Sequence, residues 1–111
     1  MSGDQKKGGP PSRKTERDDA TMLKERISRP RRFKVMLHND DFTPMEFVVH
    51  VLEDVFRRTK AEATRIMLTV HNDGVAIAGV YPREVAETKC ALTVQYARDN
   101  GYPLLLTTEP E

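Results

Sequence analysis

Residues 38–45 (HNDDFTPM) contain the side chains of this chain whose types and spacing are best suited to chemistry. Asn39, Asp40 and Asp41 follow one another directly, and an amide carbonyl and two carboxylates all accept hydrogen bonds. Taken by itself, such a run is typical of an ordinary turn, because Asn and Asp side chains often satisfy the backbone of their own loop. The functional alternative is a site for a ligand that carries several hydrogen-bond donors.

A strand and a helix must position this loop. Residues 33–37 alternate apolar and polar side chains, which predicts a half-buried strand. After the loop, Thr43 can cap a helix, Pro44 fits its first position, and Glu46 completes a capping box. Apolar residues then recur at helical spacing, so a helix is predicted over residues 44–58.

A second helix follows with almost no connection. Thr59 and Glu62 form another capping box, and residues 71–74 (HNDG) end the helix and turn the chain. The remaining elements are predicted as a strand at 75–80, a helix at 82–100 and a strand at 104–108. This order predicts an α+β fold, β-α-α-β-α-β, in which three helices cover one face of a small three-stranded, mainly antiparallel sheet.

Residues 1–32 differ in composition from this domain at 33–111. They carry ten basic and five acidic residues, whereas residues 33–111 carry eight basic and twelve acidic ones. Rich in Gly, Pro and charge, the first segment is predicted to be a disordered arm, either a solubilising leader or a tether gripped by another protein. It has no aromatic residues and no block of positive charge, so nucleic-acid binding is not expected.

The chain has one cysteine, Cys90, which leaves no internal disulfide and suits a reducing, cytoplasmic setting. No stretch resembles a signal peptide or a membrane span, so we expect no membrane association. Cys90 falls within an apolar row of the third helix, and no Ser–His or Cys–His pair can be placed. We therefore expect no enzyme activity and no cofactor.

A short helical hairpin runs antiparallel, which brings the end of the second helix beside the start of the first. His71 is then expected near the acidic loop. Neutral imidazole, amide and carboxylate oxygens would form a ring of acceptors beside an apolar pocket. That combination matches a protonated peptide N-terminus followed by a hydrophobic first side chain. The pocket residues are expected to be Met45, Val48, Met67 and Val70.

Plainer interpretations of the same residues stay open. Met67 and Val70 on a helix face usually belong to a core, and a histidine at a helix C-terminus usually complements the helix dipole. A metal-dependent hydrolase using Asp40, Asp41 and His71 is the sharper alternative, although the chain lacks HxH or HExxH spacing. A ribosomal-stalk-like interaction domain of similar fold is a third.

Three segments resemble signatures of the ClpS adaptor family. Residues 38–48 (HNDDFTPMEFV) are similar to its NDD-x-TPM-x-FV motif, residues 67–71 (MLTVH) to its M-x-x-VH element, and residues 85–89 (VAETK) to its VAETK element. The resemblance covers residues 33–108 in order and spacing. It implies a bacterial or plastid-type adaptor that binds N-degron substrates beginning with Leu, Phe, Tyr or Trp and delivers them to a Clp-family AAA+ unfoldase with its protease.

The resemblance also implies roles for individual residues. Asn39, Asp41 and His71 would hold the α-amino group. Asp40 would belong to the same group of acceptors, and Asp40 and Thr43 together would shape the site. Met45 would act as a gate against β-branched first residues, and Leu104 would join the apolar pocket lining. Glu84 and Lys89, exposed on the third helix, would form part of the surface that docks a ClpA- or ClpC-type unfoldase acting with ClpP. The protein would act as a monomer.

Overall fold

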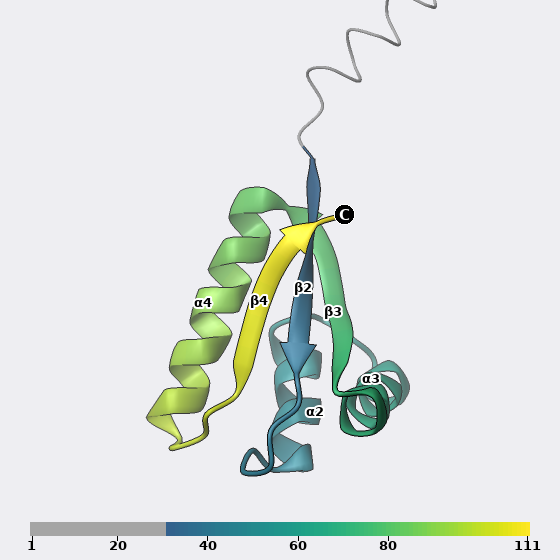
Figure 1. The fold of residues 1–111 in the computed structure, drawn as a ribbon, viewed down its shortest axis with the longest axis vertical. Coiled ribbons are helices and arrows are strands. Elements are labelled where there is room, and N and C mark those ends of the chain that lie inside the picture. Colours follow the sequence, from purple (N-terminus) through teal and green to yellow (C-terminus); the bar gives the residue numbers. More distant parts are fainter. Residues whose placement is uncertain (1–30) are drawn as a thin grey trace, which may run out of the picture. The chain divides into compact units, whose positions relative to one another are not determined.

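Strand β2 lies at the centre of a three-stranded antiparallel sheet ordered β3-β2-β4, in the computed structural model (Figure 1). The structure describes residues 31–111, so the predicted arm lies outside the described residues except for Arg31 and Arg32. The element order confirms the predicted α+β fold. The elements are β2 (Arg32–His38), α2 (Met45–Asp54), α3 (Lys60–Asp73), β3 (Val75–Pro82), α4 (Arg83–Asp99) and β4 (Leu105–Pro110).

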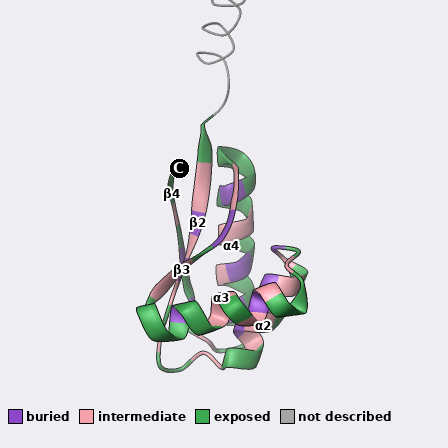
Figure 2. Cartoon of the chain, turned by 90° about the vertical axis from the view of Figure 1, so that its right-hand side faces the viewer, coloured by how far each residue is buried: buried purple, intermediate pink, exposed green. Residues whose placement is uncertain are grey.

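The helices lie on one side of the sheet, and the core fills the space between them. Figure 2 shows α2 and α4 on that side, while α3 packs against both α2 and β3. Alternate residues of β2 face the helices, and Val35 and Leu37 are fully buried there. The other buried apolar residues are Val48, Val51, Leu52, Phe56, Ala63, Val70, Ala78, Ala86, Ala97, Leu104 and Leu106.

Helix α2 starts later than predicted. Pro44 is its N-cap, with ψ 145°, and the predicted capping box of Thr43 and Glu46 is not formed. Instead, Thr43 donates both its hydroxyl and its backbone N–H to the carboxylate of Asp40. These two hydrogen bonds hold Thr43 in the loop. The carbonyl of Pro44 therefore accepts the first hydrogen bonds of the helix, from the N–H groups of Phe47 and Val48.

Helix α2 also ends earlier than the predicted residue 58. Arg57 adopts a left-handed conformation with φ 56°, and the N–H of Arg58 returns to the carbonyl of Leu52 at 3.0 Å. The Arg58 side chain donates to the carbonyl of Ala78 in β3 at 3.0 Å. The chain therefore leaves the helix at Val55, and the Arg58 side chain is held by β3.

Both ends of α3 follow from the sequence. Thr59 and Glu62 form the predicted capping box, with bonds of 2.9 and 3.1 Å. Those bonds also hold the pKa of Glu62 below its usual value. Gly74 ends the helix with φ 90°, a conformation that favours glycine, and its carbonyl accepts the N–H of Asn39 at 2.9 Å. The acidic loop is thereby fixed to the end of α3.

Helix α4 packs its predicted inward row, since Ala86, Thr93 and Ala97 are all buried. Cys90 in the same row is half-buried, and its thiol donates to the carbonyl of Leu106 at 3.0 Å. Burial raises the pKa of Cys90, which keeps the thiol protonated and weakly nucleophilic. None of the helices within residues 31–111 is long and apolar enough to cross a membrane.

Candidate functional site

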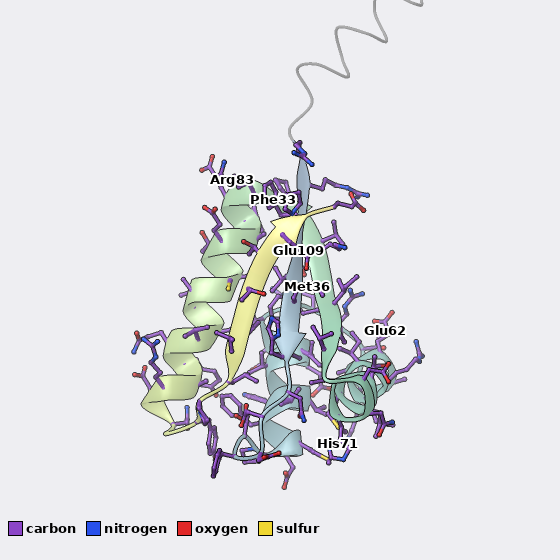
Figure 3. All side chains as sticks on the ribbon, viewed as in Figure 1. Phe33, Met36, Glu62, His71, Arg83 and Glu109 are labelled. Atoms are coloured by element: carbon purple, nitrogen blue, oxygen red, sulfur yellow. The ribbon has the colours of Figure 1, made fainter. Side chains whose placement is uncertain are left out.

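A cavity of about 180 Å³ lies where the loop after β2 meets the last turns of α3. Figure 3 shows His71 at this end of the molecule. The start of α2 and the end of α3 form two walls, as the predicted antiparallel hairpin requires. All of the lining residues had been named as candidates from the sequence, and they are Asn39, Asp40, Asp41, Thr43, Met45, Val48, Met67, Val70 and His71.

The mouth of the cavity carries hydrogen-bond acceptors that have no partner in the described part of the chain. Asn39, Asp41 and His71 are exposed, and within residues 31–111 their side chains form no hydrogen bond or ion pair. Carboxylate and amide carbonyl oxygens accept hydrogen bonds, and a neutral imidazole accepts at one nitrogen. This rim can therefore bind a group with several N–H donors without first breaking a bond inside the protein.

Asp40 lies in the same loop, but its carboxylate is hydrogen-bonded to other residues of that loop. Its Oδ1 accepts the backbone N–H groups of Phe42 and Thr43 at 2.8 and 2.7 Å, and its Oδ2 accepts the Thr43 hydroxyl at 2.7 Å. Burial acts to raise its pKa, but these three hydrogen bonds outweigh burial and hold the pKa of Asp40 below its usual value. Both oxygens are therefore already engaged, unlike those of Asp41.

The floor of the cavity is apolar. Val48 and Val70 are 7% and 3% exposed and belong to the hydrophobic core, so the core interpretation and the pocket interpretation both hold for them. Met67 is half-buried, and Met45 is 43% exposed at the edge. Apolar cavities of roughly 150 Å³ accept a benzene ring, so about 180 Å³ fits one leucine or aromatic side chain.

One expected pocket residue is elsewhere. Leu104 is 4% exposed and lies within the hydrophobic core, and it is not among the residues that line the cavity. It directly precedes β4, and its side chain is buried with the core residues. The spacing of apolar residues in the sequence does not distinguish a core residue from a neighbouring pocket residue.

Lys89 is also placed differently from the expectation that it is exposed on its helix. Its side chain is half-buried, and Nζ donates to the carbonyl of Val55 at 2.7 Å, just past the end of α2. The ammonium lies 5.2 Å from the centre of the Tyr81 ring. Burial raises the pKa of Tyr81, which keeps its ring neutral. Glu84 is exposed as expected, and both residues border a shallow depression on α4.

These contacts predict that Lys89→Ala destabilises the domain by about 1–2 kcal/mol, because a charged hydrogen bond to the end of α2 is lost. The free energy of unfolding in urea measures this. Glu84→Ala, in the same depression, is the matched control and should change stability by less than about 0.5 kcal/mol. Equal stability of the two variants would show that the Lys89–Val55 bond contributes nothing.

No three His, Cys, Asp or Glu side chains are close enough within residues 31–111 to hold a metal ion. Asp40, Asp41 and His71 share the cavity without forming a group of ligands. The hydrolase alternative requires such a group, and nothing in the geometry of the described residues supplies it.

Comparison with known proteins agrees with this architecture. The model of the family described as "ATP-dependent Clp protease adaptor protein ClpS" matches residues 28–107. The chain belongs to the ClpS family. The match includes the strand β2, the acidic loop, the α2–α3 hairpin and the first half of β4, so the cavity falls within the matched residues.

Individual relatives cover most of the chain. It is 57% identical over 93 residues to a ClpS adapter protein from Nitratidesulfovibrio vulgaris, covering 84% of this chain and 93% of that one. A ClpS 1 adapter protein of Rhodopseudomonas palustris is 52% identical over 79% of this chain and 85% of its own. The solved structure of Agrobacterium tumefaciens ClpS2 bound to L-phenylalaninamide has 47% identity and a TM-score of 0.72, covering 75% of this chain and 100% of that one.

Proposed function

We propose that this protein is a non-enzymatic, cytoplasmic adaptor that binds the free α-amino group and the large hydrophobic first side chain of N-degron substrates. The observation that carries this proposal is a cavity with an apolar floor whose rim holds Asn39, Asp41 and His71, three side chains without a hydrogen-bond partner among residues 31–111. The carboxylate of Asp40 stabilises the loop that contains Asn39 and Asp41, by accepting the backbone N–H groups of Phe42 and Thr43. Leu, Phe, Tyr and Trp are the first residues that such a cavity accepts.

The physical chemistry of the two parts is sufficient for useful affinity. Each charge-assisted hydrogen bond from an ammonium contributes about 1.5–3 kcal/mol, and burying a Leu or Phe side chain contributes a similar amount. Three such bonds and one buried side chain sum to about 6–12 kcal/mol before ordering costs, and micromolar affinity corresponds to about 8 kcal/mol. The binding of L-phenylalaninamide by the Agrobacterium relative supports this, because that ligand carries a free α-amino group and an aromatic side chain.

The family name supports delivery of the bound substrate to a Clp protease. We infer that a ClpA- or ClpC-type AAA+ unfoldase acting with ClpP is the partner, that exposed Glu84 contributes to docking, and that the adaptor acts as a monomer. Lys89 would contribute to this surface indirectly. Its ammonium donates to the carbonyl of Val55, so it would hold the end of α2 in place beside the docking surface. The arm at residues 1–32 would be the segment that the unfoldase engages.

A titration over peptides that differ only in residue one tests the binding part of this proposal. Peptides that begin with Leu, Phe, Tyr or Trp should bind, and those that begin with Ser or Glu should not. Equal affinity across the panel would contradict a selective cavity. Stoichiometric zinc or iron in the purified protein, with an activity lost on its removal, would favour the hydrolase instead.

The gate residue gives a selectivity prediction. Met45 is 43% exposed at the edge of the cavity, and its flexible side chain limits the width of the opening. Met45→Ala should admit peptides that begin with Ile or Val, with a gain of about tenfold over the unmodified protein, while Phe-peptides change little. Fluorescence anisotropy with the same panel measures the ratio. If Ile-peptides gained nothing, Met45 would not act as the gate.

A further inference from the structure

A second hollow, of about 500 Å³, continues from the cavity along the seam between α2 and α3. We call it the seam groove, and its floor is formed by Met45, Val49 and Met67, with Glu53 and Lys60 at its far end. Met45 and Met67 line both hollows. The two therefore meet at a shared pair of methionine side chains, which are flexible and adapt to different neighbours.

We propose that the seam groove binds the third to fifth residues of the substrate chain, so that the site recognises a short segment and not the first residue alone. This inference rests on the proposed function, because it needs the first residue to be held in the cavity. Met45 and Glu53 are eight residues apart on α2, about 12 Å along a helix. Three to four residues of extended chain span that distance at about 3.3–3.6 Å each.

The chemistry of the groove defines the occupant. Its floor is apolar, which favours one hydrophobic side chain lying on Val49. Its borders carry the carboxylates of Glu46 and Glu53 against the single ammonium of Lys60. His50, also at the border, contacts the carboxylate of Asp54 at 3.0 Å, which adds a further negative group nearby. The groove therefore favours apolar and basic residues and opposes acidic ones.

Chemical-shift mapping of the whole chain locates the bound segment directly. Phenylalaninamide fills only the position of residue one, whereas the peptide Phe-Arg-Leu-Lys-Ala-Ala-amide reaches further. Amide resonances of residues 39–41 and 70–71 should move with both ligands. Those of Val49, Glu53 and Thr64 should move only with the peptide.

The outcomes separate this inference from the function on which it rests. If phenylalaninamide fails to bind, both are overturned. If phenylalaninamide binds and the peptide moves no resonance along the groove, the inference alone is overturned.

A charge exchange tests the groove energetically. Wild-type protein should bind the peptide with Lys at position four about three- to fivefold more tightly than the same peptide with Glu there. Glu53→Lys should remove or reverse that preference without changing the affinity for phenylalaninamide. Glu109→Lys on β4, exposed and outside the groove, makes the same change of charge and is the matched control.

The control decides whether the effect is local. If Glu109→Lys reduced the preference as much as Glu53→Lys, the preference would come from the overall acidity of the domain and the groove would have no role. Retention of the full preference by Glu53→Lys would overturn the inference equally.

Discussion

N-acetylation of a peptide that begins with Phe should lower its affinity for this protein by at least about a hundredfold. Acetylation removes the positive charge and two of the three N–H donors, so at least two bonds to the rim are lost. At about 1.5–3 kcal/mol for each charge-assisted bond, the loss is at least about 3 kcal/mol, and tenfold in affinity is about 1.4 kcal/mol. Isothermal titration with matched free and acetylated peptides measures it.

Substitutions in the rim of the cavity should also lower the affinity for a free amino group. Asp41→Asn keeps the shape of the side chain and removes its charge, and His71→Ala removes a second acceptor from the rim. Each should weaken binding of phenylalaninamide by tenfold or more while leaving the melting temperature nearly unchanged, because both residues are exposed. Glu109→Gln, exposed on β4 and outside both hollows, is the control and should leave binding unchanged. Equal binding of free and acetylated peptides would show that the amino group is not recognised.

Asp40→Ala should destabilise the protein and weaken binding together. The substitution removes three hydrogen bonds that hold Phe42 and Thr43 in the loop, and partial exposure of Asp40 limits the cost to about 1–3 kcal/mol. Because the loop would no longer be fixed, the affinity for phenylalaninamide should fall by about tenfold. Urea denaturation and titration measure the two effects.

The contribution of Asp40 also depends on pH. Its pKa in the folded protein lies below the usual 3.8, so protonation is harder in the folded state than in the unfolded state. The stabilisation is complete above the unfolded pKa and is lost as the pH falls through the lowered folded value. The stability difference between wild type and Asp40→Ala should therefore be constant from about pH 5 to 8 and shrink below about pH 4. An unchanged difference at low pH would mean that the carboxylate charge is not what holds the loop.

The elements of this fold could be predicted because the local signals agree with the tertiary contacts. The alternation in β2, the Thr59–Glu62 capping box and Gly74 each specify their structure through neighbouring residues. The position of the cavity also followed from the sequence, since a tight connection forces α2 and α3 to run antiparallel. That brings His71 to the acidic loop.

The late start of α2 follows from the bonds between Asp40 and Thr43, three residues apart, but other departures from prediction depend on partners far away in the sequence. The Lys89 ammonium bonds to Val55, 34 residues away, and the Arg58 side chain bonds to Ala78, 20 residues away, so neither of these two contacts has a signal in the neighbouring sequence. Leu104 belongs to the core and not to the cavity lining, and the spacing of apolar residues does not distinguish the two placements.

The different roles of Asp40 and Asp41 in the acidic loop show most clearly what could not be predicted from the sequence. Sequence alone established that acceptors, an apolar hairpin and a histidine belong to one site, because residue types and local periodicity suffice for that. Only the structure shows that the carboxylate oxygens of Asp40 accept hydrogen bonds from Phe42 and Thr43, while those of Asp41 accept none from residues 31–111. The two neighbouring side chains are identical and differ in the direction that the loop backbone gives them. The loop is itself fixed by the bond from the N–H of Asn39 to the carbonyl of Gly74, 35 residues away.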